Sequence, residues 1–157
     1  MDNISLYHHI SVLLARYVHV IDGDQLEEWP GLFTERCLYR VISRENHARE
    51  LPIAAIFCDS RGMLTDRVVS LRHANIYEKQ SYRHVVSSIL VEENTDGSYA
   101  ALSNYVVYRT RTDGATAVYN AGAYEDRIVV KNDQWLFAEK HVIFDTGRID
   151  TQMVIPI

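Results

Sequence analysis

Hydrophobic residues recur every three or four positions in the first part of the chain. The series is Ile4, Tyr7, Ile10, Leu14, Tyr17, Val18 and Ile21. This spacing places the side chains on one face of a helix, and Asn3 or Ser5 can cap its start. The run Asp22-Gly23-Asp24 predicts the end of the helix, with Gly23 in a left-handed conformation.

Two more helices are expected before the middle of the chain. Asp24 can cap a second helix, which Pro30 keeps short or irregular. Its apolar side chains are Leu26, Trp29, Leu32 and Phe33. A third helix is predicted to begin at Asp59 or Ser60, where either residue can act as the cap. Its shared face consists of Met63, Leu64, Arg67, Val68 and Leu71.

Strands account for most of the remaining pattern. In the first half we expect strands at residues 37–42 and 53–58, separated by a charged loop at 46–51. The second half predicts four antiparallel strands at residues 82–91, 99–112, 115–130 and 135–145. Asp113-Gly114 is a hairpin signal, turns are expected at 94–97 and 131–133, and Gly122 predicts a bend or bulge.

The order of the elements defines a fold class. Helices that come first and long strands that follow predict an α+β fold, with about three N-terminal helices on one face of a curved mixed or antiparallel sheet. Bent strands wrapped around a helix form a cone with an open mouth. Residues 1–157 contain no linker or internal repeat, so we expect a single domain.

Composition narrows the function classes. Hydrophobic residues make up 47% and charged residues 24% of the chain, as in soluble proteins. The net charge of −5 argues against a nucleic-acid partner. No apolar run is long enough to cross a membrane and no secretory signal is visible, so we expect a cytoplasmic protein. Cys37 and Cys58 are expected to be reduced and buried.

Two stretches resemble a known family. They are Leu38-Tyr39-Arg40-Val41-Ile42-Ser43-Arg44-Glu45-Asn46, continuing from residue 51 to 68, and Asn75-Ile76-Tyr77-Glu78-Lys79-Gln80-Ser81-Tyr82-Arg83-His84. Both resemble the small (β) subunit of Rieske-type aromatic-ring-hydroxylating dioxygenases, especially the members that act on terephthalate, anthranilate, benzoate and salicylate. The opening third, with Trp29, Phe33 and Tyr39, resembles the wider cystatin-like cone superfamily, which includes the SnoaL-like enzymes.

The resemblance implies a role within a larger enzyme. In this family the small subunit is mainly structural and pairs with a large (α) subunit, usually in a trimer of heterodimers that includes contacts between small subunits. The large subunit holds the Rieske iron–sulfur cluster and a mononuclear iron. A separate reductase supplies electrons from NAD(P)H. The assembled enzyme adds dioxygen to an aromatic ring.

The histidine and cysteine spacing predicts no metal site in this chain. A Rieske centre needs two Cys and two His, each Cys close to a His in sequence. No His lies near Cys37 or Cys58, so the cluster is not expected here. His8 and His9 point to different faces of a helix and the remaining histidines are isolated, so no iron site of two His and one carboxylate is expected either. No nucleotide loop or activated nucleophile is visible.

A stand-alone enzyme of the SnoaL-like type, an isomerase, dehydratase or hydrolase, is the alternative hypothesis. It would use acid–base groups that project into the cone. The candidates for such a pocket are Asp22, Tyr39, His84, Glu139 and His141. Glu139 and His141 are two positions apart on one strand, so they share a face and could both point into the cone. The structural interpretation, in which the two side chains form a satisfied polar cluster at the mouth, is favoured.

Other polar residues are expected to have structural or interface roles. Asp59 and Arg67 are candidates for an internal ion pair that fixes the third helix against the sheet. The apolar tail at residues 153–157 is expected to dock on the fold or on a partner. The candidates for contact with a partner subunit are Arg61, Tyr82, Arg83, Ile155 and Ile157.

Overall fold

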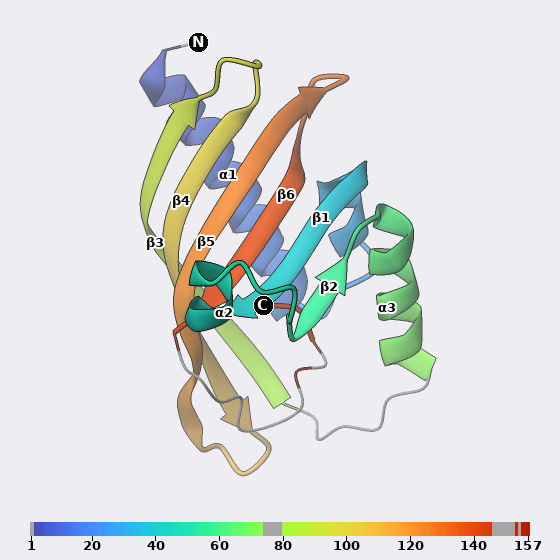
Figure 1. The fold of residues 1–157 in the computed structure, drawn as a ribbon. Coiled ribbons are helices and arrows are strands. Elements are labelled where there is room, and N and C mark those ends of the chain that lie inside the picture. The colour runs from blue at the N-terminus through green and yellow to red at the C-terminus, as the bar shows by residue number, and fades with distance from the viewer. Residues whose placement is uncertain (1, 74–79, 146–152, 154) are drawn as a thin grey trace.

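A six-stranded mixed sheet curves around the first helix (Figure 1). The computed structural model describes residues 2–73, 80–145, 153 and 155–157. The strands lie in the order β2-β1-β6-β5-β4-β3, and every neighbouring pair is antiparallel except β1 with β6, which is parallel. Helices precede the long strands, so the predicted α+β class with a mixed sheet is confirmed.

Helix α1 (Asn3–Asp22) crosses the sheet on its inner side (Figure 1). Asp2 caps it by accepting hydrogen bonds from the backbone N–H groups of Ile4 and Ser5, so the expected caps Asn3 and Ser5 were wrong. The predicted buried face was also partly wrong, because Ile4 is 83% exposed. The buried side chains of this helix are Leu6, Ile10, Leu13, Leu14, Tyr17, Val20 and Ile21.

The end of α1 differs from the prediction in one detail. Gly23 has an ordinary negative φ of −84°, and Asp24 takes the left-handed conformation with a φ of 55°. Asp24 therefore does not cap the next helix, and its carboxylate instead pairs with Arg72. The next helix is the short 3-10 helix η1 (Trp29–Leu32), which has Pro30 in its first turn.

The segment between the first two strands contains a short helix, where the charged sequence predicted only a loop. Strand β1 (Phe33–Ser43) is longer than predicted, and Ser43 caps helix α2 (Arg44–Ala48) by accepting from the N–H of Asn46. Part of the expected loop at 46–51 is therefore helical. Strand β2 (Ile56–Cys58) is shorter than predicted, and helix α3 (Arg61–His73) follows, with the hydroxyl of Ser60 accepting from the Met63 N–H.

The long strands occupy nearly the predicted ranges. They are β3 (Gln80–Glu93), β4 (Tyr99–Arg111), β5 (Thr116–Lys131) and β6 (Gln134–Phe144). Gly97 and Gly114 have positive φ values of 79° and 86° in the predicted turns. Gly122 is not at a bulge, because the β4–β5 register shifts at Val107/Tyr108. It is required for close approach, since an added Cβ would overlap the backbone of Ile143.

The end of the chain packs inside the fold. Ile155 and Ile157 are buried, as is Met153. The backbone carbonyl of Ile157 accepts hydrogen bonds from Tyr17 at 2.7 Å and Tyr39 at 3.0 Å. The expected docking of the tail thus occurs on this chain's own core, and Ile155 and Ile157 are not available as exposed contacts for a partner.

Candidate functional site

Asp22 and His84 form a buried pair between the end of α1 and β3. The Asp22 Oδ1 lies 2.6 Å from His84 Nδ1, and Asp22 Oδ2 accepts from the His84 backbone N–H at 2.8 Å. Their side chains are 5% and 0% exposed. This two-point contact fixes the ring, and the second ring nitrogen, Nε2, is buried without a hydrogen-bond partner among the described residues. Two of the predicted pocket residues therefore do meet.

Lys140 is the charged group that the sequence interpretation missed. It lies on β6 with its side chain fully buried, and Nζ lies 3.0 Å from Asp126 Oδ2 on β5. The ammonium also lies 3.7 Å from the ring centroid of Tyr124 and 4.5 Å from that of Tyr17. Burial raises the pKa of Asp126 to about 6 and lowers that of Lys140, because each charged form loses water. The aromatic faces of Tyr124 and Tyr17 and the Asp126 carboxylate make the interactions with the Lys140 ammonium that water would otherwise make.

Glu139 and His141 share a face, but it is the outer face of the sheet. Lys140 between them points inward, so its two neighbours must point outward. There the Glu139 carboxylate lies 3.4 Å from His141 Nε2, and Arg40 Nε donates to His141 Nδ1 at 3.2 Å. Burial and the nearby Arg40 lower the pKa of His141. The expectation that the two could point into the cone was wrong, because the inward-facing position of β6 is the residue between them, Lys140.

Tyr39 does point inward, as expected, but its hydroxyl is fully engaged. It donates to the Ile157 carbonyl, accepts from the Ile157 N–H at 3.2 Å, and lies 3.3 Å from the Tyr17 hydroxyl. Burial raises the pKa of Tyr39 above its usual value. Tyr39 thus holds the tail in place and has no hydrogen-bonding capacity left for a ligand.

The candidate ion pair between Asp59 and Arg67 is absent, although the structure describes both residues. Asp59 is exposed, and the Arg67 guanidinium donates to the Met153 carbonyl at 3.1 Å. Arg61 was expected at an interface. Its guanidinium instead donates to the Phe33 carbonyl and pairs with Glu35, so it joins α3 to β1 within the chain.

The two interface candidates on β3 point in opposite directions. Tyr82 is buried, accepts from Gln80 Nε2 at 2.6 Å and packs on Tyr119 with ring centroids 5.3 Å apart. Arg83, the next residue, is exposed. Of the five interface candidates, only Arg83 presents a freely exposed side chain.

No group of three His, Cys, Asp or Glu side chains within the described ranges is arranged to hold a metal ion. Cys37 and Cys58 are both buried free thiols. Burial raises the pKa of Cys37 to about 11 and raises that of Cys58, so both thiols stay protonated at neutral pH. A Rieske cluster needs two His besides two Cys, and within the described ranges no such group surrounds these thiols, so they do not fit a Rieske cluster. In the described part of the chain, no helix is long and apolar enough to span a membrane.

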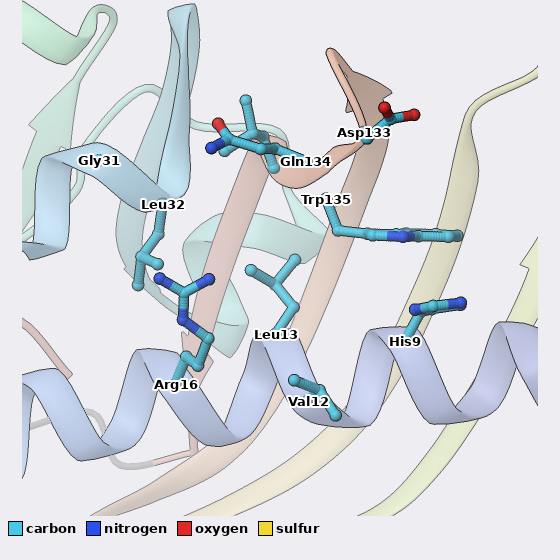
Figure 2. A pocket seen from close by; sticks show the side chains of 10 residues that line it. His9, Val12, Leu13, Arg16, Gly31, Leu32, Asp133, Gln134 and Trp135 are labelled. Carbon is cyan, nitrogen blue, oxygen red and sulfur yellow. The ribbon is translucent and has the colours of Figure 1, made fainter.

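A surface pocket of about 210 Å³ lies between α1, η1 and the start of β6 (Figure 2). We call it the α1–β6 pocket. His9 stacks on Trp135 at its rim, with ring centroids 4.9 Å apart and an angle of 11° between the planes. Arg16 and Asp133 also line it. The other lining residues are Val12, Leu13, Gly31, Leu32, Gln134 and Leu136. Sequence analysis missed this pocket, because its residues come from three separate elements.

Comparison with known proteins identifies the family. The model of the ring hydroxylating beta subunit family matches residues 16–151. The anthranilate 1,2-dioxygenase small subunit of Burkholderia cepacia is 42% identical over 99% of this chain and 97% of its own length. The terephthalate 1,2-dioxygenase terminal oxygenase component subunit beta 1 of a Comamonas species is 34% identical over 94% of this chain and 96% of its own.

Solved structures give the same result. The β subunit of a candidate aromatic-ring-hydroxylating dioxygenase from Novosphingobium aromaticivorans superposes with a TM-score of 0.88 at 39% identity, covering 98% of this chain and 97% of that one. ActVI-ORFA of Streptomyces coelicolor shares the fold alone, with a TM-score of 0.71 at 22% identity over 90% and 98% of the two chains. The fold is that of the cone proteins, and the chain belongs to the family of ring-hydroxylating dioxygenase β subunits.

Proposed function

We propose that this chain is a structural subunit without a catalytic centre of its own. It supports a large oxygenase subunit that carries the Rieske cluster and the mononuclear iron. Family membership supports the assignment to an oxygenase, because the matching relatives are small or β subunits. The observation that carries the structural role is the interior of the cone, where charged side chains are bound to one another.

The interior contacts leave little for a substrate to bind. The Lys140 ammonium is held by the Asp126 carboxylate and by the face of Tyr124. Tyr39 is occupied by the tail. The described groups that favour a cone enzyme are the His84 Nε2 and the Tyr124 hydroxyl, which are buried without a hydrogen-bond partner among the described residues. A buried nitrogen without a partner is also common at sites where an ordered water binds, so it does not by itself define a catalytic base.

The assembled enzyme would contain this chain and its large subunit in equal numbers, arranged as a trimer of heterodimers with contacts between small subunits. It would act in the cytoplasm, where a separate reductase supplies electrons from NAD(P)H. The two named relatives belong to dioxygenases of anthranilate and terephthalate, which are both aromatic carboxylates. We therefore infer an aromatic carboxylate as the substrate class of the assembled enzyme, which would serve in bacterial breakdown of aromatic compounds.

Co-expression with the cognate large subunit tests the proposal. We expect the two chains to co-purify as one large, red-brown complex that contains iron and hydroxylates an aromatic carboxylate when supplied with reductase and NAD(P)H. The chain purified alone should be colourless and inactive. A large subunit that is stable and fully active without this chain would contradict the structural role.

A further inference from the structure

The segment Ile155–Ile157 lies in the core as a bound ligand would. Ile157 is completely buried. The Tyr17 hydroxyl on α1 and the Tyr39 hydroxyl on β1 both donate to the Ile157 carbonyl oxygen, at 2.7 Å and 3.0 Å. The Ile157 N–H in turn donates to the Tyr39 hydroxyl at 3.2 Å. A few placed polar groups that converge on one group in an apolar interior are the usual make-up of a small-molecule site.

The walls around these two hydroxyls are aromatic. Phe33 lies edge-on to both rings, with centroids 6.5 Å from Tyr17 and 5.9 Å from Tyr39. Trp29 lies edge-on to Tyr39 at 5.0 Å. Ile157 packs in the same core cluster. Aromatic walls make specific edge and face contacts with a planar ring, which an aliphatic side chain does not provide.

The tail leaves two polar groups of this aromatic cluster unsatisfied. The Trp29 Nε1 and the Tyr124 hydroxyl are buried without a hydrogen-bond partner among the described residues. The Tyr124 ring lies edge-on to that of Tyr17, with centroids 6.1 Å apart. Burial and the nearby Tyr105 raise the pKa of Tyr124 well above its usual value, so its hydroxyl remains a donor. The cluster therefore offers more hydrogen bonds than the tail uses, and unmet buried donors cost free energy.

We propose that this aromatic cluster is a binding site for a small neutral ring compound with a carboxamide group, and that Ile155–Ile157 blocks the site as an intramolecular competitor. The carboxamide is favoured because it repeats the peptide group of the tail. Its carbonyl oxygen accepts from Tyr17 and Tyr39, and its N–H donates to Tyr39. A carboxylate has no donor for Tyr39 and loses more hydration on burial. The proposal concerns the free chain and does not rest on the proposed function.

The tail competes at a high local concentration. The Arg67 guanidinium on α3 donates to the Met153 carbonyl at 3.1 Å, which keeps the following residues near the site. A group on a short tether has an effective concentration of about the millimolar range. The full-length chain should therefore bind a free carboxamide more weakly than a chain that lacks Ile155–Ile157.

Benzamide is the probe that tests the site. Benzoate and toluene are its controls, because they share the ring but lack the N–H or every polar group. Truncation before Ile155 removes the competing segment. Within the truncated chain, Tyr39→Phe removes the central hydroxyl, and Tyr108→Phe alters an exposed tyrosine on β4 as the matched control. Titration calorimetry measures each dissociation constant, and thermal unfolding shows which truncated chains fold.

We expect the truncated chain to bind benzamide roughly tenfold more tightly than the full-length chain does, and more tightly than it binds benzoate or toluene. Tyr39→Phe should weaken benzamide binding about fivefold to tenfold and leave toluene binding unchanged. Tyr108→Phe should change neither. If the folded truncated chain binds benzamide no better than either control compound, the cluster is only an apolar cavity and the proposal is overturned.

Hydrogen exchange in the full-length chain decides the matter if the truncated chain does not fold. The bond to Tyr39 protects the Ile157 N–H, so benzamide that displaces the tail should accelerate its exchange. The N–H of Val142, in the buried part of β6, should keep its rate, and toluene should change neither rate. An unchanged Ile157 rate at benzamide concentrations well above the millimolar range would overturn the proposal. Neither test involves the large subunit, so failure here leaves the proposed function intact.

Discussion

The interior of the cone and the α1–β6 pocket both contain an acid and a base, but they use them in opposite ways. In the interior, Lys140 and Asp126 are completely buried and lie within 3.0 Å of each other. In the pocket, Arg16 and Asp133 line one small space without pairing. Buried charges must be paired to be tolerated, whereas exposed charges can remain free for a partner. The comparison separates the charges that stabilise the interior of the cone from those that stay unpaired at its surface.

The largest expected effect comes from breaking the interior ion pair. Lys140→Met keeps the volume but leaves the Asp126 carboxylate buried without its cation, which should cost about 3–5 kcal/mol of unfolding free energy at pH 8. Chemical denaturation measures this loss. The double variant Lys140→Met/Asp126→Asn should recover most of it. Equal losses in the single and double variants would show that the ion pair does not account for the effect.

The same pair predicts a pH dependence. Burial raises the pKa of Asp126 to about 6, above its ordinary value of 3.8, so the folded chain holds this proton more tightly than the unfolded chain does. The contribution of Asp126 to stability is therefore present below pH 3.8 and is lost as the pH rises through about 6. Relative to Asp126→Asn, the wild type should lose stability between pH 4 and pH 7 in denaturation series. If the wild type instead gained stability relative to Asp126→Asn over this pH range, the raised pKa of Asp126 would be contradicted.

Breaking the Asp22–His84 contact should lower the free energy of unfolding by an intermediate amount. Asp22→Ala leaves the His84 backbone N–H and Nδ1 without their acceptor, which should cost about 2–3 kcal/mol. Asp24→Asn is the control on the neighbouring exposed turn, because Asn tolerates the left-handed conformation of this residue, and the lost ion pair with Arg72 should be worth about 1 kcal/mol or less. A loss in Asp22→Ala no greater than that of the control would mean that the buried pair does not hold α1 against β3.

The next largest loss of stability is expected when the attachment of the C-terminal tail is weakened. Tyr39→Phe removes the hydroxyl that exchanges two hydrogen bonds with the backbone of Ile157, so we expect a loss of about 1–2 kcal/mol. Tyr108→Phe removes a hydroxyl from an exposed tyrosine and should change the stability little. The two variants are compared by thermal unfolding, and equal melting temperatures would argue against a role for Tyr39 in holding the tail.

The smallest effect is expected on the outer face of the sheet. Burial and Arg40 lower the pKa of His141, so the unfolded chain binds this proton more readily than the folded one. The contribution of His141 is therefore present above its ordinary pKa of 6.5 and is lost as the pH falls through the lowered value. His141→Gln should lose less stability than the wild type on acidification from pH 7, and His8→Gln on the exposed face of α1 should follow the wild type.

The sequence predicted the fold well because periodicity and turn residues are local signals. Strand ranges in the second half and the turns at Gly97 and Gly114 follow directly from such signals. The interior was predicted less well. Lys140 was not considered as a core residue, since lysine is almost never fully buried without a partner, and its partner Asp126 is on another strand. The inward placement of Lys140 also reversed the expected direction of Glu139 and His141.

The family resemblance was accessible from the sequence, and Asp22 and His84 were each predicted as candidates for the cone. Both residue types suit acid–base work, but the contact between Asp22 and His84 was not predicted, because it joins segments 62 positions apart in the chain. The α1–β6 pocket could not be predicted, because three elements create it only after folding. The same holds for the tail, whose apolar residues did not reveal that Tyr17 and Tyr39 would bind Ile157.

The turnover of the assembled oxygenase per mononuclear iron, measured with wild-type and His84→Asn chains, tests the central claim most directly. The account predicts equal rates for complexes of equal size and iron content, because the free Nε2 of His84 belongs to a supporting subunit. Abolished turnover in a complex that assembles normally would contradict it and would place part of the chemistry inside this cone.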